Sequence, residues 1–194
     1  MMNRQTWFVT GAASQLGADI VRGALAAGHR VVAADRDALA TLARIGPAAD
    51  ARLLVVALDE VDSTSVAAAV QAGVDRFGAI DVAVHGAAAC SPRGPFAPRQ
   101  DFSASVRALF NVTRGVLATM REQRAGRVHH LVPPADRADR ADGPTLFSIP
   151  GFCAAVSADV APFGVEVAPL APQQWPRLLC AATGSGRDAL LQAA

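Results

Sequence analysis

The sequence contains no tyrosine and no lysine, so all 18 of its cationic side chains are arginine. Together with 17 acidic residues they give a formal net charge of +1, which excludes the strongly basic surface of a nucleic-acid-binding protein. The three cysteines are far apart and lack C-x-x-C spacing, so neither a disulfide framework nor a zinc site is expected. No apolar run approaches the ~20 residues that cross a membrane. We therefore expect no nucleic-acid, membrane or metal partner.

The residues that are present are typical of a compact globular protein. Hydrophobic residues make up 52% and charged residues 18% of the 194 positions, enough to build a single domain over 1–194 without disulfides. Because a first strand begins within about six residues of the N-terminus, there is no room for a signal peptide, and we expect a cytoplasmic protein. The abundance of alanine and arginine is typical of a GC-rich bacterial genome.

Short apolar or β-branched runs alternate with longer helical patterns along the chain. Six strands alternating with helices predict the α/β class, a Rossmann-like, doubly wound parallel sheet with strand order 3-2-1-4-5-6. The expected strands are Thr6–Thr10, Arg30–Ala34, Arg52–Ala57, Ile80–Val84, Arg127–Val132 and Gly164–Ala168. The expected helices cover 15–28, 37–44, 62–77, 101–124 and 150–161. We expect Gly28 to stop the first helix and Pro150 to begin the last one, because proline lacks the N–H that a helix interior needs.

The first expected strand runs into a glycine-rich turn, TGAASQLG, over residues 10–17. In such a strand–turn–helix unit, backbone N–H groups and the helix N-terminus attract a pyrophosphate. Gly11 would make the tight turn and Gly17 would allow close helix–strand packing. Asp35, at the end of the second strand, stands near the spacing at which a carboxylate binds the adenosine ribose, which favours NAD over NADP.

The order of motifs resembles the short-chain dehydrogenase/reductase family from about Thr6 to Pro172. Besides the turn, Leu58-Asp59 is similar to the family's adenine-contacting position, and the segment 81–88, DVAVHGAA, stands where a family strand ends in NNAG. The resemblance implies NAD as a possible cofactor and, because the chain after Pro172 is short, a missing seventh strand. The candidate cofactor-binding residues are Gly11, Ser14, Gln15, Leu16, Gly17, Asp35, Arg36, Asp59 and Ala87.

The departures from the family are concentrated at its functional positions. Gln15 replaces the middle glycine of the turn, and this change either destroys the phosphate site or is absorbed by a small rotation. The family's redox chemistry uses a Tyr-x-x-x-Lys pair, a serine and a helix asparagine, and hydride transfer needs that proton relay. Without tyrosine or lysine no alignment restores the pair, and the equivalent positions fall on Asp142, Leu146, Pro133 and Ser105.

Other side chains near the carboxyl ends of the strands are candidates for proton transfer. Histidine titrates near neutral pH, and a His–Asp pair can catalyse a step without a hydride. His129 and His130 point to opposite faces of one strand, so at most one faces the cleft. The candidate catalytic residues are His85, His130, Asp142 and Ser105, with Cys90 as an unpaired alternative.

Three functions remain open from the sequence. The first is a redox-inactive family member that binds a small molecule in the former cleft and catalyses a cyclisation, dehydration or isomerisation in a biosynthetic pathway. The second is a non-catalytic structural or regulatory subunit, for which the family resemblance implies a homodimer formed through helices 101–124 and 150–161. Phe152, Val156 and Val160 would supply its apolar contacts. The third is an NAD-dependent oxidoreductase with an atypical proton relay.

Overall fold

The computed structural model describes residues 4–46, 51–86, 102–132 and 143–182. Six parallel strands form one sheet in the order β3-β2-β1-β4-β5-β6, which confirms the predicted fold class and strand order. The strands are β1 (Thr6–Thr10), β2 (Arg30–Asp35), β3 (Leu53–Ala57), β4 (Val82–His85), β5 (Gly126–Leu131) and β6 (Val165–Leu170). The helices are α1 (Gln15–Ala26), α2 (Ala38–Ile45), α3 (Ser63–Phe77), α4 (Phe102–Gln123), α5 (Gly143–Val160) and α6 (Trp175–Ala182).

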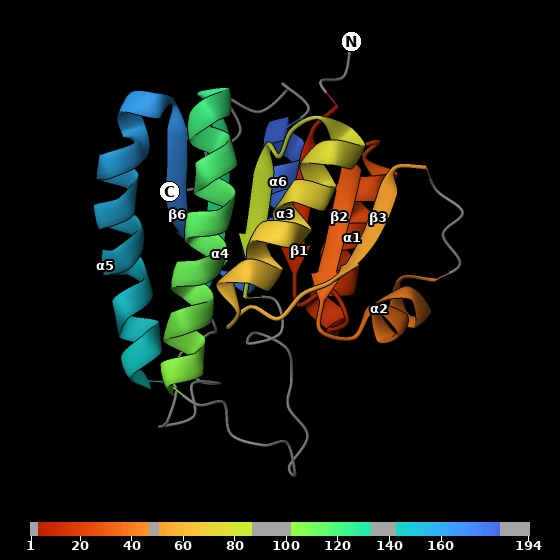
Figure 1. The fold of residues 1–194 in the computed structure, drawn as a ribbon, viewed down its shortest axis with the longest axis horizontal. Helices are drawn as coiled ribbons and strands as arrows, with labels where there is room; N and C mark the ends of the chain where they lie inside the picture. Colours follow the sequence, from red (N-terminus) through yellow and green to blue (C-terminus); the bar gives the residue numbers. More distant parts are fainter. Residues whose placement is uncertain (1–3, 47–50, 87–101, 133–142, 183–194) are drawn as a thin grey trace.

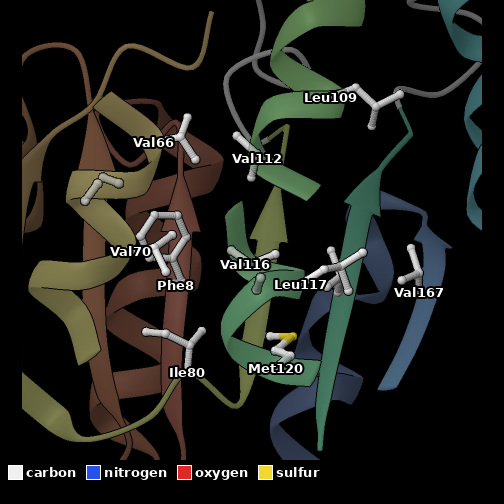
Figure 2. Packing of buried hydrophobic residues seen from close by; sticks show 14 of the residues in the cluster. Phe8, Val66, Val70, Ile80, Leu109, Val112, Val116, Leu117, Met120 and Val167 are labelled. Atoms are coloured by element: carbon white, nitrogen blue, oxygen red, sulfur yellow. The ribbon is translucent and has the colours of Figure 1, made fainter. Parts of the chain in front are cut away.

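The helices cover both faces of the sheet (Figure 1), and each face has its own hydrophobic cluster. Helices α3, α4 and α5 pack on one face, where Phe8 of β1 meets Val70 of α3 and Val116 of α4 among the buried side chains (Figure 2). Helices α1 and α6 pack on the other face over Trp7 and Val9. The alternation of Trp7 and Phe8 between the two clusters is the two-residue period of a strand buried on both sides.

Local sequence signals fix most helix ends. Ser14, Asp37 and Asp62 cap α1, α2 and α3 by accepting backbone N–H groups at 2.9–3.0 Å. Gly28 follows α1 with a φ of +86°, which agrees with its predicted role as the stop of that helix.

The expected start of the last long helix at Pro150 is wrong. Helix α5 begins seven residues earlier, at Gly143, and Pro150 lies inside it. The second residue of α5 is Pro144, which suits the first turn of a helix because its missing N–H has no intrahelical partner there. The proline that marks the start of α5 is therefore Pro144. Pro150 has no N–H, so the carbonyl of residue 146 lacks its usual helical donor.

The segment after β6 contains a helix that is not among those predicted from the sequence. It forms a 3-10 turn, Pro172–Gln174, followed by α6. The Trp175 ring lies so close to α1 that a Cβ on Gly23 would be 2.7 Å from it, so Gly23 makes room for the ring. Across the described ranges, no helix combines the length and apolarity needed to cross a bilayer.

Candidate functional site

The turn between β1 and α1 has the close packing that its glycines predict. Gly11 has a φ of +68°, and a Cβ on Gly17 would lie 2.2 Å from the Gly11 carbonyl oxygen. The Ser14 hydroxyl donates to that same oxygen at 2.7 Å and accepts the Gly17 N–H at 3.0 Å. Gly11, Ser14 and Gly17 thus fix one loop conformation, and Gly17 cannot be replaced without moving the loop.

Gln15 does not fill the loop, although it replaces a glycine of the family pattern. It is the first residue of α1, and its side chain is hydrogen-bonded to Asp19 of the same helix and to Arg44 of α2. Its Nε2 lies 3.2 and 3.3 Å from the two Asp19 carboxylate oxygens, and its Oε1 accepts from Arg44 at 3.1 Å. The glutamine side chain is thus engaged by α1 and α2, while the close packing of Gly11 and Gly17 is kept. Leu16 packs against the buried cluster of α1.

The acidic side chains at the ends of β2 and β3 border the same turn. Asp35 accepts the Ala13 N–H at 3.0 Å and the Asp37 N–H at 3.3 Å. Arg36 points to Asp59, with 3.0 Å between its Nη2 and a carboxylate oxygen. This hydrogen bond lowers the pKa of Asp59 below its ordinary value. Asp35 and its neighbours therefore lie at the carboxyl edge of the sheet, where folds of this type bind ligands.

The residues at this edge of the sheet are of the types that bind a nicotinamide dinucleotide in folds of this type. Because Gly17 has no Cβ, the loop closes on the first turn of α1, and Asp35 is placed beside the loop. Gly11, Ser14, Leu16 and Gly17 would surround the pyrophosphate, and Asp35 would face the adenosine ribose. Ala87 lies outside the described residues.

The carboxyl ends of β4 and β5 bring two of the predicted catalytic residues together. His85 is the last residue of β4, and its register partner on β5 is His130. Their Nδ1 atoms lie 3.1 Å apart, and both side chains are buried. Thr113 of α4 continues the contact, with its Oγ1 3.0 Å from His130 Nε2 and 2.6 Å from the Leu109 carbonyl oxygen.

The direction of each hydrogen bond in this chain follows from its last member. A carbonyl oxygen only accepts, so the single Thr113 hydroxyl proton goes to Leu109, and His130 must donate from Nε2. Burial lowers the pKa of His130 well below its ordinary value and lowers the pKa of His85, so both rings are neutral near pH 7. Neutral His130 then accepts at Nδ1, His85 donates from Nδ1, and the Nε2 of His85 is left as an unprotonated base.

Glu60 faces that unprotonated nitrogen and is absent from the residues predicted by the sequence. One of its carboxylate oxygens lies 3.7 Å from His85 Nε2. Its negative charge raises the pKa of His85 and so opposes the larger effect of burial. A sequence signal exists, because Glu60 directly follows Asp59 at the end of β3 and so reaches the same sheet edge.

The other predicted catalytic residues do not join this chain. Ser105 lies on α4 two turns before Thr113, and within the described residues no hydrogen bond links it to either histidine. Asp142, Cys90 and Pro133 lie outside the described residues. In the ranges that the structure describes, no group of three His, Cys, Asp or Glu side chains is arranged to bind a metal ion.

One enzyme family matches most of the chain in sequence. The sequence profile described as short chain dehydrogenase matches residues 5–132, from β1 through β5 and the last residue before the undescribed segment. The chain belongs to the short-chain dehydrogenase family. The family match thus covers the glycine-rich turn, Asp35, Glu60 and the His85–His130 pair, and it stops before α5.

Two curated relatives align with most of the chain. It is 29% identical over 178 residues to the oxidoreductase BOA17 of Botryotinia fuckeliana, covering 86% of this chain and 64% of that protein. It is 32% identical over 182 residues to a Streptomyces virginiae protein assigned as the ketoacyl reductase of the monensin polyketide synthase, covering 84% of this chain and 68% of that protein. The chain therefore spans about two thirds of the length of these relatives.

Solved structures of short-chain dehydrogenases share the fold. One from Streptomyces avermitilis gives a TM-score of 0.65 at 23% identity, covering 87% of this chain and 65% of the other. A metagenomic short-chain oxidoreductase in complex with NADP gives a TM-score of 0.72 at 20% identity, covering 94% of this chain and 91% of the other.

His129, the neighbour of His130, faces the opposite side of β5, as the strand period predicts. Its side chain is buried, and neither ring nitrogen has a hydrogen-bond partner in the structure. Burial lowers its pKa to about 4. The folded protein therefore binds the proton less readily than the unfolded chain, whose histidines titrate near pH 6.5.

We expect His129→Leu to reduce the loss in the free energy of unfolding that acid pH causes. In the wild type, stability is retained above pH 6.5 and falls as the pH drops toward 4, because protonation favours the unfolded chain. Between pH 7 and pH 5 this loss is about 2 kcal/mol from His129 alone. Urea unfolding at the two pH values should show a loss smaller by that amount in the leucine variant. An equal loss in both proteins would contradict this assignment.

Proposed function

We propose that this chain is a nicotinamide-dinucleotide-dependent oxidoreductase in which His85 exchanges the proton that a tyrosine exchanges elsewhere in the family. The observation that carries the proposal is the hydrogen-bond chain Leu109–Thr113–His130–His85. It leaves His85 Nε2 unprotonated at the carboxyl edge of the sheet, on the same side as the glycine-rich turn.

The comparisons favour this oxidoreductase alternative over the redox-inactive protein that heads the sequence-based hypotheses. One relative is named an oxidoreductase, another is assigned as a ketoacyl reductase, and a structural neighbour holds NADP. The intact geometry around Gly11, Ser14 and Gly17 supports dinucleotide binding. When bound, the nicotinamide supplies the hydride exchange that no amino-acid side chain can provide.

His85 is suited to take a proton from a substrate hydroxyl or to return one to a carbonyl oxygen. Its imidazolium form would be stabilised by the Glu60 carboxylate, 3.7 Å from Nε2. His130 and Thr113 position the ring and fix its tautomer. They do not conduct protons away, because the chain ends on a helix carbonyl that cannot accept one. A carbonyl or secondary alcohol substrate fits this chemistry.

The proposal is tested first by cofactor binding and then by turnover. NADH and NADPH are titrated against the protein, and a rise in melting temperature or a fluorescence change reports binding. Turnover of a panel of ketones is then compared between the wild type and His85→Gln. We expect the variant to bind cofactor normally but to lose about a hundredfold or more in kcat, because general acid–base catalysis is removed.

Two further variants sharpen this test. His29→Gln alters a buried histidine that pairs with the Gln5 N–H away from the site, and it should leave turnover unchanged. Glu60→Gln should move the acid limb of the pH–rate profile to lower pH, because the charge that raises the pKa of His85 is lost. Full turnover by His85→Gln would overturn the proposed role.

A second candidate is a non-redox proton transfer by the same histidine. The absence of tyrosine and lysine favours it, because neither the family's proton donor nor its pKa-lowering cation is present. Cyclisation, dehydration and isomerisation need only an oriented base such as His85 Nε2. The two candidates differ in the cofactor: no binding of NADH or NADPH at millimolar concentration favours the non-redox step.

We also propose a homodimer, formed through α4 and α5, as the state in which either activity operates. A hollow of about 360 Å³ lies between these helices, lined by Phe110, Leu117, Phe152 and Val156 among others. Phe110 is 55% exposed and packs edge to face on Phe152. Val160, predicted as a third contact residue, is instead buried in the core and is not available to a second subunit.

Phe110→Ser should weaken the dimer, because a large apolar side chain that a partner would bury is removed. Leu39→Ser on α2 is the matched control, since Leu39 is 78% exposed and lies outside this hollow. Sedimentation equilibrium measures both variants. We expect the dissociation constant of the dimer to be at least tenfold higher for Phe110→Ser and unchanged for Leu39→Ser. A wild-type protein that is strictly monomeric overturns the dimer.

A further inference from the structure

A second hollow lies beside the glycine-rich turn, between α1 and α2. It measures about 460 Å³ and lies next to the loop residue Ala13. Its lining residues are Ala13, Gln15, Arg22, Ala40, Ala43 and Arg44. Two of these six carry a positive charge and none carries a negative charge, so the lining favours an anion.

The two arginines have different partners. Arg22 pairs with the Asp19 carboxylate and donates to the Arg44 carbonyl oxygen at 2.7 Å. Arg44 donates to the Gln15 amide oxygen at 3.1 Å, and within the described residues no carboxylate pairs with its guanidinium. Among the described residues Arg44 is therefore held by Gln15, the residue that replaces the family's middle glycine, and not by a carboxylate.

We propose that Arg44, seated by Gln15, is a phosphate-binding residue of the dinucleotide site. The proposal rests on the proposed function, because the ligand is the dinucleotide itself. The family pattern uses a glycine so that backbone can approach the phosphate, whereas here a side-chain guanidinium is brought to the edge of the same loop. Arginine suits this role because its planar fork binds phosphate oxygens in pairs.

Two phosphate groups of a dinucleotide present this chemistry, the pyrophosphate and the adenosine 2′-phosphate. Asp35 accepts the Ala13 N–H next to the hollow, and its carboxylate repels a 2′-phosphate. Arg44 attracts either group. If the 2′-phosphate is the ligand, Arg44 reverses the NAD preference that Asp35 alone predicts.

The alternative is that the Gln15–Arg44 hydrogen bond only ties α1 to α2. The dissociation constants of the ligands report whether Arg44 binds phosphate, and the melting temperature reports whether its hydrogen bond to Gln15 stabilises the packing of α1 on α2. NADH, NADPH, 5′-ADP and 2′,5′-ADP are titrated by calorimetry at low and high salt against the wild type, Arg44→Gln and Arg44→Lys. Arg177→Gln is the matched control, because Arg177 is an exposed arginine of α6 outside this hollow.

We expect Arg44→Gln to weaken binding about tenfold or more, with a smaller salt dependence, because a charge-assisted hydrogen bond is lost. Arg44→Lys keeps the charge but loses the planar fork, so it should retain only part of the affinity, and Arg177→Gln should retain all of it. A loss for the three ligands that carry a pyrophosphate, NADH, NADPH and 5′-ADP, identifies the pyrophosphate as the group bound. A loss for NADPH and 2′,5′-ADP alone identifies the 2′-phosphate. Both results support the proposal.

Unchanged affinity in Arg44→Gln, with or without a lower melting temperature, overturns this inference and leaves the proposed function standing. A wild type that binds neither NADH nor NADPH overturns both. Binding that depends on Arg44 in a protein that reduces no ketone supports the phosphate site and counts against the oxidoreductase.

Discussion

The hydrogen bond from Thr113 Oγ1 to the Leu109 carbonyl oxygen, 2.6 Å long, sets the direction of every other hydrogen bond at the histidine pair. A threonine hydroxyl has one proton, and once that proton is committed, each following nitrogen has only one possible role. The basic nitrogen of His85 is therefore determined by a residue on α4 that does not touch it. Without Thr113 the pair could take either of two opposite arrangements, with His85 or with His130 as the donor between the two Nδ1 atoms.

This constraint explains how the family fold can hold an oriented base after losing its tyrosine and lysine. The sheet supplies the geometry, because the register of β4 and β5 pairs His85 with His130 at the edge where ligands bind. The packing supplies the protonation state, because burial keeps both rings neutral. The glycine-rich turn lies at the same edge of the sheet, and Gln15 at the start of α1 accepts a hydrogen bond from Arg44.

The sequence predicts the parts of the fold that depend on local rules. The alternation of strands and helices, the stop of α1 at Gly28 and the tight packing at Gly17 follow from hydrophobic periodicity and from glycine chemistry. The opposite directions of His129 and His130 follow from the strand period alone.

The features that could not be predicted from the sequence depend on tertiary contacts, or on a choice between two residues with the same local chemistry. Glu60 becomes a neighbour of His85 only when β3 and β4 are placed in one sheet on either side of β2 and β1. Either Pro144 or Pro150 can start a helix by its local chemistry, and the structure has the earlier one. Val160 fits an interface pattern by spacing, but the packing of α5 against β6 buries it.

The central claim is the tautomer of His85, and nitrogen chemical shifts of the imidazole rings measure it directly. In protein labelled with ¹⁵N at histidine, His85→Gln and His130→Gln assign the signals. Near pH 7 we expect His85 to be protonated at Nδ1 and bare at Nε2, and His130 to be protonated at Nε2 and bare at Nδ1. A His85 protonated at Nε2, or a cationic ring at this pH, would contradict the account.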